Sequence, residues 1–177
     1  CVIKASEAAN WSQKTKHKVP LKGIGLSCCN HVSGNRPFAR EFDGGSGMVR
    51  IGMDGRITVF HGESDMGQGQ NTVFAQIVAE RLGVTMDMIH VAQVDTDISP
   101  FGLGSFATRG TLMGGNGLLA AAENTYEQLA EGAADLLNVT TDAIQCRKGI
   151  FSVKDAPANK ISFREVTSQA TIRKHGV

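Results

Sequence analysis

The segment His61-Gly-Glu-Ser-Asp-Met-Gly-Gln-Gly-Gln-Asn-Thr72 decides how the chain around it is organised. Residues 56–60, just before it, alternate moderately between apolar and polar side chains, which predicts a strand. After it, apolar residues recur at helical spacing as far as Leu82, and Gly83 suits the position just past the end of a helix. We therefore predict a strand, a glycine-rich loop and a helix in succession.

The regions on either side extend this pattern. Residues 47–51 form a predicted partner strand, and Asp54-Gly55 between the two strands is a strong hairpin signal. A third strand is expected at about 88–94, after the helix. A second glycine-rich stretch, residues 101–117, then leads into further elements. These are a helix from about Thr111 or Asn116 to Leu137 and short strands near 143–146 and 150–153, with a turn at Lys148-Gly149.

Two short stretches of the chain are similar to each other. Leu82-Gly-Val-Thr-Met-Asp-Met-Ile89 matches Leu137-Asn-Val-Thr-Thr-Asp-Ala-Ile144, and in each we expect a helix to end, a threonine to cap one short turn and a strand to begin. The element order predicts an α+β fold, with a mixed sheet, helices packed on one face and two similar β-α-β units. Residues 1–20 are expected to be a linker or a partial element of a preceding domain, and 21–177 one domain that is incomplete at its carboxyl end.

Composition limits the classes of partner. A formal net charge of +1 argues against nucleic acid or an anionic membrane. No apolar run approaches the ~20 residues of a membrane span, and the polar residues 1–18 do not suit a signal peptide. The spacing of Cys1, Cys28, Cys29 and Cys146 suits neither a zinc ribbon nor an iron–sulfur cluster, so we expect free thiols and a cytoplasmic location.

The first glycine-rich loop, centred on Gly67-Gln68-Gly69, is a candidate binding site. Glycines let backbone N–H groups approach a ligand, and a helix start favours an anionic phosphate or a metal-bound oxygen. Gln68 adds a neutral amide that can donate a hydrogen bond without adding charge. The alternative is a helix entry whose glycines serve only tight packing.

The second loop, Asp95 to Thr111, follows a strand and precedes a helix, which is the arrangement of an anion cradle. Ser105, Thr108 and Thr111 offer hydroxyls, and Arg109 offers a planar fork suited to a diphosphate. The loop contains neither a Walker motif nor a complete G-x-G-x-x-G pattern. The alternative is a surface loop with an exposed arginine.

Together the loops resemble a known family. Met66-Gly-Gln-Gly-Gln-Asn-Thr72, followed by Asp95-Thr-Asp97, Pro100 and Gly104-Ser-Phe-Ala-Thr-Arg109, is similar to the molybdenum-binding subunit of the xanthine oxidase family, which includes aldehyde oxidoreductases and carbon monoxide dehydrogenase. The resemblance runs from about Lys22 to Gly149. Within the family, the sequences of these two motifs look closest to those of the alpha subunit of 4-hydroxybenzoyl-CoA reductase.

The resemblance implies which residues contact a pterin cofactor. Gln68 would donate a hydrogen bond to an oxo ligand of molybdenum, and the second loop would wrap the pterin and its phosphates with backbone amides. The dithiolene of the pterin would hold the metal, so neither a metal ligand nor a catalytic residue is expected in this chain. The implied cofactor-binding residues are Gly67, Gln68, Gly69, Thr72, Gly104, Ser105, Phe106, Ala107, Thr108, Arg109, Gly110 and Thr111.

The resemblance also implies chemistry and partners. Members catalyse two-electron oxidation or reduction at an aromatic or carbonyl carbon, and the sub-family would remove a phenolic hydroxyl from a coenzyme A thioester. The cofactor of a bacterial member would be molybdopterin cytosine dinucleotide. Electrons would pass through an iron–sulfur subunit and an FAD subunit, which would assemble with the remainder of the molybdenum subunit.

The chain departs from the family pattern at two points. The glutamate that serves the family as general base, and an earlier glycine-rich cofactor loop, are missing, and Glu165 has the sequence context of an ordinary, solvent-facing helix start. We therefore expect the isolated chain to be inactive. A metal site at His61, Glu63 and Asp65 is disfavoured by the intervening glycine. A non-catalytic assembly or binding module that has lost the cofactor is the alternative function.

Overall fold

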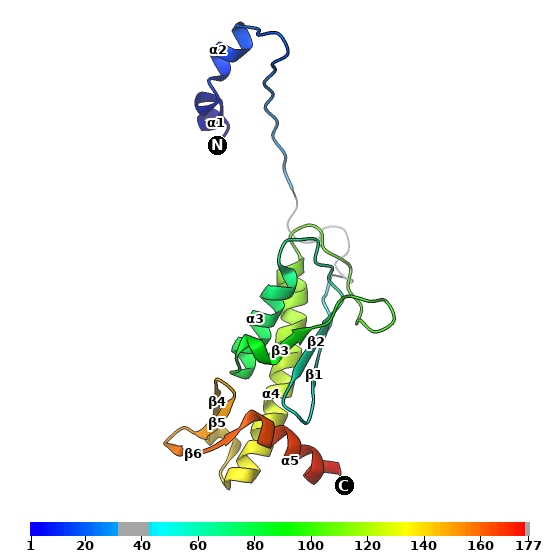
Figure 1. Ribbon diagram of the computed structural model, residues 1–177, viewed down its shortest axis with the longest axis vertical. Helices are drawn as coiled ribbons and strands as arrows, with labels where there is room; N and C mark the ends of the chain where they lie inside the picture. The colour runs from blue at the N-terminus through cyan, green and yellow to red at the C-terminus, as the bar shows by residue number, and fades with distance from the viewer. Residues whose placement is uncertain (32–42, 176–177) are drawn as a thin grey trace. The chain divides into compact units, whose positions relative to one another are not determined.

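The computed structural model describes residues 1–31 and 43–175, and side chains as far as Gln169. It divides the chain into two compact units, Cys1–Val32 and Ser33–Val177, which are described separately. The first unit contains two short helices, α1 (Val2–Ala8) and α2 (Trp11–Lys16), which bury none of their residues. Figure 1 shows both helices in blue.

The first sheet of the second unit has the strand order β1-β2-β3 (Figure 1). β1 (Gly47–Ile51) and β2 (Ile57–His61) are antiparallel and joined by the Asp54-Gly55 turn, which confirms the predicted hairpin. β3 (Ile89–Val91) lies parallel to β2, because α3 (Gln70–Leu82) returns the chain between the two strands. β3 is shorter than the sequence predicted.

Helix α3 ends as its sequence predicts. The amide of Val84 donates to the carbonyl of Ala79 at 3.0 Å, and Gly83 adopts the left-handed conformation with φ 69°, which together form a Schellman motif. Glycine is required at 83 for a second reason, because a Cβ there would lie 2.2 Å from the carbonyl oxygen of Cys146. The fully buried apolar residues of α3 are Phe74, Val78 and Leu82.

The long helix α4 (Gly115–Leu137) packs against elements of both sheets. It begins with a wide π-helical turn, η2 (Gly110–Gly114), and contacts β1 and α3 as well as the second sheet. It also contacts α5 (Phe163–His175). The second sheet is antiparallel, in the order β4 (Ile144–Arg147), β5 (Ile150–Val153), β6 (Ala156–Ser162).

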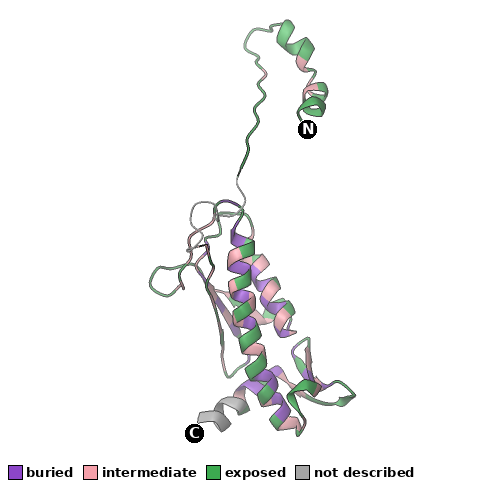
Figure 2. Ribbon diagram, turned by 180° about the vertical axis from the view of Figure 1, so that it is seen from behind, coloured by how far each residue is buried: buried purple, intermediate pink, exposed green. Residues whose placement is uncertain are grey.

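The predicted α+β class is confirmed, with the strands divided between two three-stranded sheets. Lys148 and Gly149, with φ 50° and 75°, form the predicted turn between β4 and β5. β6 was not predicted, because most of its residues are exposed and show no apolar alternation. Figure 2 shows buried residues where α3 and α4 meet. One core cluster serves both sheets and includes Ile57, Val59, Phe74, Leu82, Leu118, Ala122, Leu129, Ala133, Phe151, Phe163 and Val166.

The two similar stretches have the same geometry, with one difference from the prediction. Each helix ends at a left-handed residue, Gly83 or Asn138, and a short 3₁₀ turn precedes each following strand. Thr85 and Thr140 occupy the expected N-cap positions, but their side chains make no capping hydrogen bond. Backbone hydrogen bonds alone close these turns. Separately, no helix in the described part of the chain is long and apolar enough to cross a membrane.

The burial of Cys146 predicts its reactivity. Burial raises the pKa of the Cys146 thiol to about 12, so the reactive thiolate is scarce near neutral pH. Cys1, Cys28 and Cys29 are exposed. We expect a thiol-reactive aromatic disulfide at about pH 8 to modify these three rapidly and the half-buried Cys146 much more slowly until the chain unfolds. Peptide mass spectrometry would identify the modified residues, and equal labelling of Cys146 in the folded chain would contradict its burial.

Candidate functional site

Two glycine-rich segments lie side by side in the second unit, here named loop one (residues 62–69) and loop two (residues 100–109). A Cβ on Gly62 or on Gly102 would lie 2.4 Å from a backbone atom of the other residue, so the two main chains touch at glycines. The hydroxyl of Ser105 donates to the carbonyl of Ser64. The structure therefore brings together the two segments that the sequence motifs pair.

Arg109, at the end of loop two, has a fully buried side chain that ties three segments together. Its Nη1 donates to both carboxylate oxygens of Glu63, at 2.7 and 2.9 Å, and to the carbonyl of Gly104 at 3.0 Å. Its Nε donates to Oδ1 of Asp43 at 3.0 Å, and its Nη2 donates to the carbonyl of Gly44. Every nitrogen of the guanidinium is engaged within the chain.

This placement differs from the expected diphosphate fork. Burial alone would lower the pKa of Arg109, but hydrogen bonds to Asp43 and Glu63 outweigh it and raise the pKa. A fully buried guanidinium enclosed between two carboxylates is inaccessible to a ligand, whereas the main chain of Arg109 remains part of loop two. Sequence reasoning missed Glu63 as its partner because 46 positions separate the two residues.

Asp65 caps helix α3 from within loop one. Its Oδ2 accepts a hydrogen bond from the amide of Asn71 at 3.0 Å, and its Oδ1 accepts one from Gly67 at 2.9 Å. These bonds, the one from Asn71 first, lower the pKa of Asp65, so the residue is a carboxylate at neutral pH. An internal anion therefore occupies the helix start where the sequence suggested an external phosphate.

The side chain of Gln68 is exposed but bonded within loop one. The amide of Met66 donates to Oε1 of Gln68 at 2.6 Å, which fixes the orientation of the side-chain amide. Its Nε2 then donates to the carbonyl of Ser64 at 3.1 Å and to Oε1 of Gln70 at 3.2 Å. In this conformation Gln68 stabilises the loop. To donate a hydrogen bond to a ligand, its Nε2 would have to give up the bond to Ser64 or to Gln70.

Gln70 is a second residue that the sequence did not single out. It is buried, and its Nε2 has no hydrogen-bond partner among the described residues. A Cβ on Gly110 would lie 2.4 Å from Oε1 of Gln70, so the glycine makes room for this side chain at the start of η2. Gln70 thus fills the junction between the starts of the two helices.

The glycines of the loops divide into two kinds. Those at Gly62 and Gly102 are required by close contacts within the chain. Gly67, Gly69 and Gly104 have φ of 102°, 81° and 97°, and a Cβ on any of them would meet no atom within 4 Å. These three glycines present bare backbone to open space. The expectation that the glycines serve ligand approach therefore applies to this subset alone.

The start of η2 has free backbone donors. Among the described residues, none accepts a hydrogen bond from the amides of Gly110, Thr111 or Leu112, which lie at the positive end of the α4 dipole. Ala107 and Thr108, just before them, have φ of 48° and 56°, which non-glycine residues rarely adopt. Of the remaining expected contacts, Thr72 and Phe106 are exposed and Ser105 is half-buried.

His61 and Glu165 have structural roles. Burial lowers the pKa of His61 despite a hydrogen bond to Asn71 at 3.0 Å, and its ring packs edge-on against Phe74. In the described residues, no three His, Cys, Asp or Glu side chains are grouped so that they could hold a metal. Glu165 is exposed, as expected, and forms a capping box with Ser162 at the start of α5.

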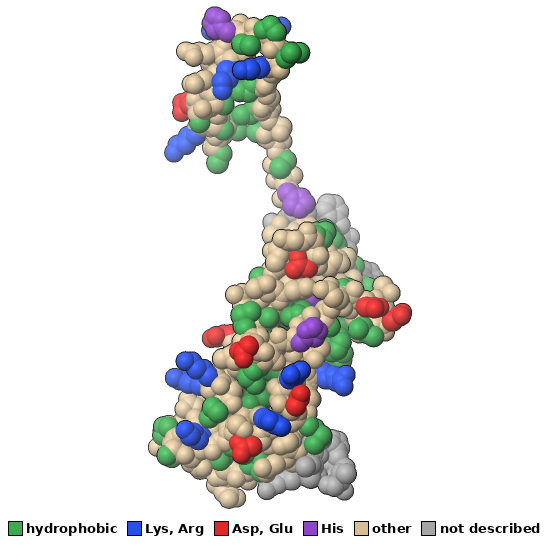
Figure 3. Space-filling view, in the orientation of Figure 1, with side chains coloured by type: hydrophobic (Ala, Val, Ile, Leu, Met, Phe, Trp, Pro, Cys, Tyr) green, Lys and Arg blue, Asp and Glu red, His purple; other side chains and the backbone are tan. Residues whose placement is uncertain are grey.

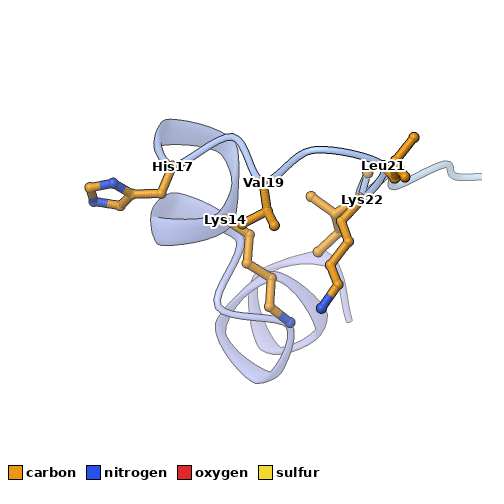
Figure 4. Close-up of a pocket in the computed structure, with 7 residues that line it drawn as sticks. Lys14, His17, Val19, Leu21 and Lys22 are labelled. Carbon is orange, nitrogen blue, oxygen red and sulfur yellow. The ribbon is translucent and has the colours of Figure 1, made fainter.

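The first unit has a shallow pocket between α2 and residues 19–24 (Figure 4). Lys14 and Lys22 are among the residues that line it, and His17 points away in this view. All three are exposed, so nothing buried organises a ligand site. On the face of the second unit in Figure 3, acidic and basic side chains are interspersed, with no extended patch of one sign.

Comparison with protein families identifies one match, to the molybdopterin cofactor-binding domain, over residues 3–177. The gamma subunit of the 6-hydroxypseudooxynicotine dehydrogenase complex of Paenarthrobacter nicotinovorans is 32% identical over 93% of this chain and 20% of its own length. The xanthine dehydrogenase molybdenum-binding subunit of Escherichia coli O157:H7 is 32% identical over 77% of this chain and 18% of its own length. The chain thus spans about a fifth of the length of these curated relatives.

Solved structures show the same similarity. Quinoline 2-oxidoreductase from Pseudomonas putida 86 superposes with a TM-score of 0.72 at 27% identity, over 96% of this chain and 23% of that chain. Reconstituted CO dehydrogenase from Oligotropha carboxidovorans superposes with a TM-score of 0.66 at 30% identity, over 71% of this chain and 16% of that chain. The similarity therefore includes the arrangement of the elements as well as the sequence.

The cap made by Asp65 predicts a pH-dependent stability. Because its folded pKa is lowered, the ionised carboxylate stabilises the fold above the ordinary aspartate pKa of about 3.9, and this contribution is lost as pH falls through the folded value. We expect Asp65→Asn to melt below the wild type near neutral pH and to approach it in acid.

Thermal unfolding of both chains between about pH 7 and pH 3 measures this difference. The control is Asp135→Asn, at an exposed position in the last turns of α4. The difference in melting temperature between this variant and the wild type should not shrink in acid. A difference for Asp65→Asn that stays constant into acid would rule out the charged cap.

Proposed function

This chain belongs to the family of molybdopterin cofactor-binding domains, and on that basis we propose that loops one and two form part of the pocket for a molybdopterin cofactor in a larger molybdenum-dependent oxidoreductase. The observation that carries the proposal is the open backbone at Gly67, Gly69 and Gly104. Positive φ combined with empty space where a side chain would be is what close approach of a ligand to main chain requires. This geometry supports assigning the three glycines to the cofactor pocket.

The chain would hold the cofactor chiefly with its main chain. The free amides of Gly110, Thr111 and Leu112 would donate to acceptor atoms, with the positive end of α4 favouring anionic ones. Bound in this way, the cofactor supplies two-electron redox chemistry at a molybdenum ion held by its own dithiolene. The full proposed set remains Gly67, Gln68, Gly69, Thr72, Gly104, Ser105, Phe106, Ala107, Thr108, Arg109 through its main chain, Gly110 and Thr111.

The finer assignments are part of the same proposal. We propose the cytosine dinucleotide form of the cofactor, and an aromatic, aldehyde or coenzyme A thioester substrate, with 4-hydroxybenzoyl-CoA as the specific candidate. Phe101 and Phe106, which are 68% and 44% exposed, support an apolar or aromatic neighbour because neither anchors loop two in the core. The names of the relatives indicate different substrates, including xanthine and carbon monoxide, so family membership leaves the substrate open.

We also propose partner subunits, on the basis of family membership. A chain that spans a fifth of its relatives would contribute one wall of the pocket, and the remainder of the molybdenum subunit would supply the others. We propose an iron–sulfur subunit and an FAD subunit as electron carriers, in the cytoplasm. Support comes from the name of one relative, which is a subunit of a dehydrogenase complex.

The alternative, a module without cofactor, is less well supported. The number of glycines is not evidence against it, because many of them serve contacts within the chain, as at Gly83 and Gly102. The open glycines are better evidence, because a loop without a ligand gains nothing from Gly67 and Gly104 at conformations that cost other residues free energy.

Two matched glycine substitutions test the proposal. Gly69 and Gly55 both have φ of 81°, so alanine strains the backbone similarly at each, by about 1 kcal/mol or more. A Cβ at Gly69 would enter the open space of the site, whereas one at Gly55 would meet Arg164 at 3.3 Å, away from the loops. We expect Gly69→Ala to lower the molybdenum and pterin content of the purified complete enzyme and Gly55→Ala to leave it unchanged.

Metal analysis and pterin fluorescence after acid release would measure both contents, with melting temperature as the check on folding. A cytidine nucleotide in the acid extract would identify the proposed form of the cofactor. A wild-type enzyme that contains no molybdenum would sink the proposed function itself.

A further inference from the structure

We propose that Arg109 is a positioning residue, whose guanidinium fastens loop two to Glu63 of loop one and thereby sets the gap between the open faces of the two loops, without touching the cofactor. The inference rests on the proposed function, because the gap has meaning only if a cofactor fills it. It concerns the interactions of the Arg109 side chain, and so differs from a role as a ligand for the cofactor phosphates.

The first step is that the guanidinium is not available to a ligand. Its side chain is 0% exposed, and Nε, Nη1 and Nη2 each donate to the chain. An incoming phosphate would have to displace Glu63 from an enclosed ion pair and leave that carboxylate buried without its cation. This displacement costs more free energy than binding of the phosphate at the free amides of η2.

The second step is that these hydrogen bonds join segments distant in sequence. Glu63 lies in loop one, Gly104 and Arg109 belong to loop two, and Asp43 and Gly44 precede β1. Nη1 of Arg109 donates both to Glu63 and to the carbonyl of Gly104. A single nitrogen thus links loop one to one of the three open glycines.

The third step is that Glu63 also supports the helix behind loop two. A Cβ on Gly114 would lie 2.8 Å from Cγ of Glu63, so the carbon chain of the glutamate packs against the last residue of η2. Loss of the ion pair would therefore loosen the start of α4 as well as the loop. Both candidate walls of the cofactor site depend on one pair of side chains.

The two roles of Arg109 predict different results for its partner. If Arg109 binds phosphate, Glu63→Gln weakens a competitor for the guanidinium and leaves cofactor retention unchanged or improved. If Arg109 positions the loops, Glu63→Gln and Arg109→Met damage the same junction. We then expect each to speed cofactor release from the complete enzyme by about tenfold or more, because Glu63→Gln replaces the ion pair between the loops by a weaker neutral hydrogen bond and Arg109→Met leaves the Glu63 carboxylate buried without its cation. The double variant should be no worse than the more damaging single variant.

Release would be followed by molybdenum lost on gel filtration with time, at a temperature where all variants remain folded. Arg109→Lys keeps the charge but loses the fork, and we expect intermediate release that partly rescues the Arg109→Met defect. Arg81→Met is the matched control, because Arg81 pairs with Glu123 and lies over Tyr126, on α3 away from the loops. It should retain cofactor as the wild type does.

A second measurement needs no bound cofactor. In the cofactor-free chain, hydrogen exchange at residues 104–113 should accelerate in Glu63→Gln, although the substitution lies in loop one. Wild-type retention and exchange in Glu63→Gln, alongside rapid release in Arg109→Met, would overturn the inference and make Arg109 a ligand. Wild-type retention in both variants would overturn it too. Either outcome with a molybdenum-loaded wild type leaves the proposed function standing.

Discussion

The enclosed ion pair between Arg109 and Glu63 is the interaction on which the arrangement of the two loops depends. Two glycine-rich segments from distant parts of the chain have few side chains with which to hold each other. Main-chain contact at Gly62 and Gly102 permits them to meet, but contact between glycines gives little affinity or orientation. A planar cation with several fixed donors supplies both, and burial makes each of its hydrogen bonds stronger than it would be in water.

The polar side chains of loop one likewise hold the loop in place with few interactions. Asp65 accepts hydrogen bonds from two backbone amides, and Gln68 donates to the carbonyl of Ser64 and to Gln70, so side chains of this segment order the loop before any ligand arrives. Preordered backbone loses less entropy when a ligand binds. In loop two the order comes from Arg109 instead, and no described residue accepts a hydrogen bond from the first main-chain amides of η2.

The sequence predicted local features well and long-range pairing poorly. The Asp54-Gly55 hairpin, the end of α3 at Gly83 and the end of α4 at Leu137 each depend on neighbours in the chain, and all three predictions are confirmed. β6 has no apolar pattern of its own and forms by pairing with β5. The side chain of Arg109 was expected at a ligand, because nothing in a sequence indicates that Glu63 will face it in the fold. The loop residues were recognised by resemblance, and their cofactor contacts remain a prediction.

Helix α4 contacts β1 of the first sheet and all three strands of the second, and the hydrophobic core has no break between them. At 1.5 Å per residue, its 23 residues form a rod roughly 35 Å long. The rod begins directly at η2, beside the loops. The two sheets therefore have to be kept together in evolution. A gene fusion, a split site or a shuffled exon that separated them would expose the apolar side chains of α4 to water. Because α4 is rigid, a tilt of its far end would also displace the glycine-rich loops beside its start.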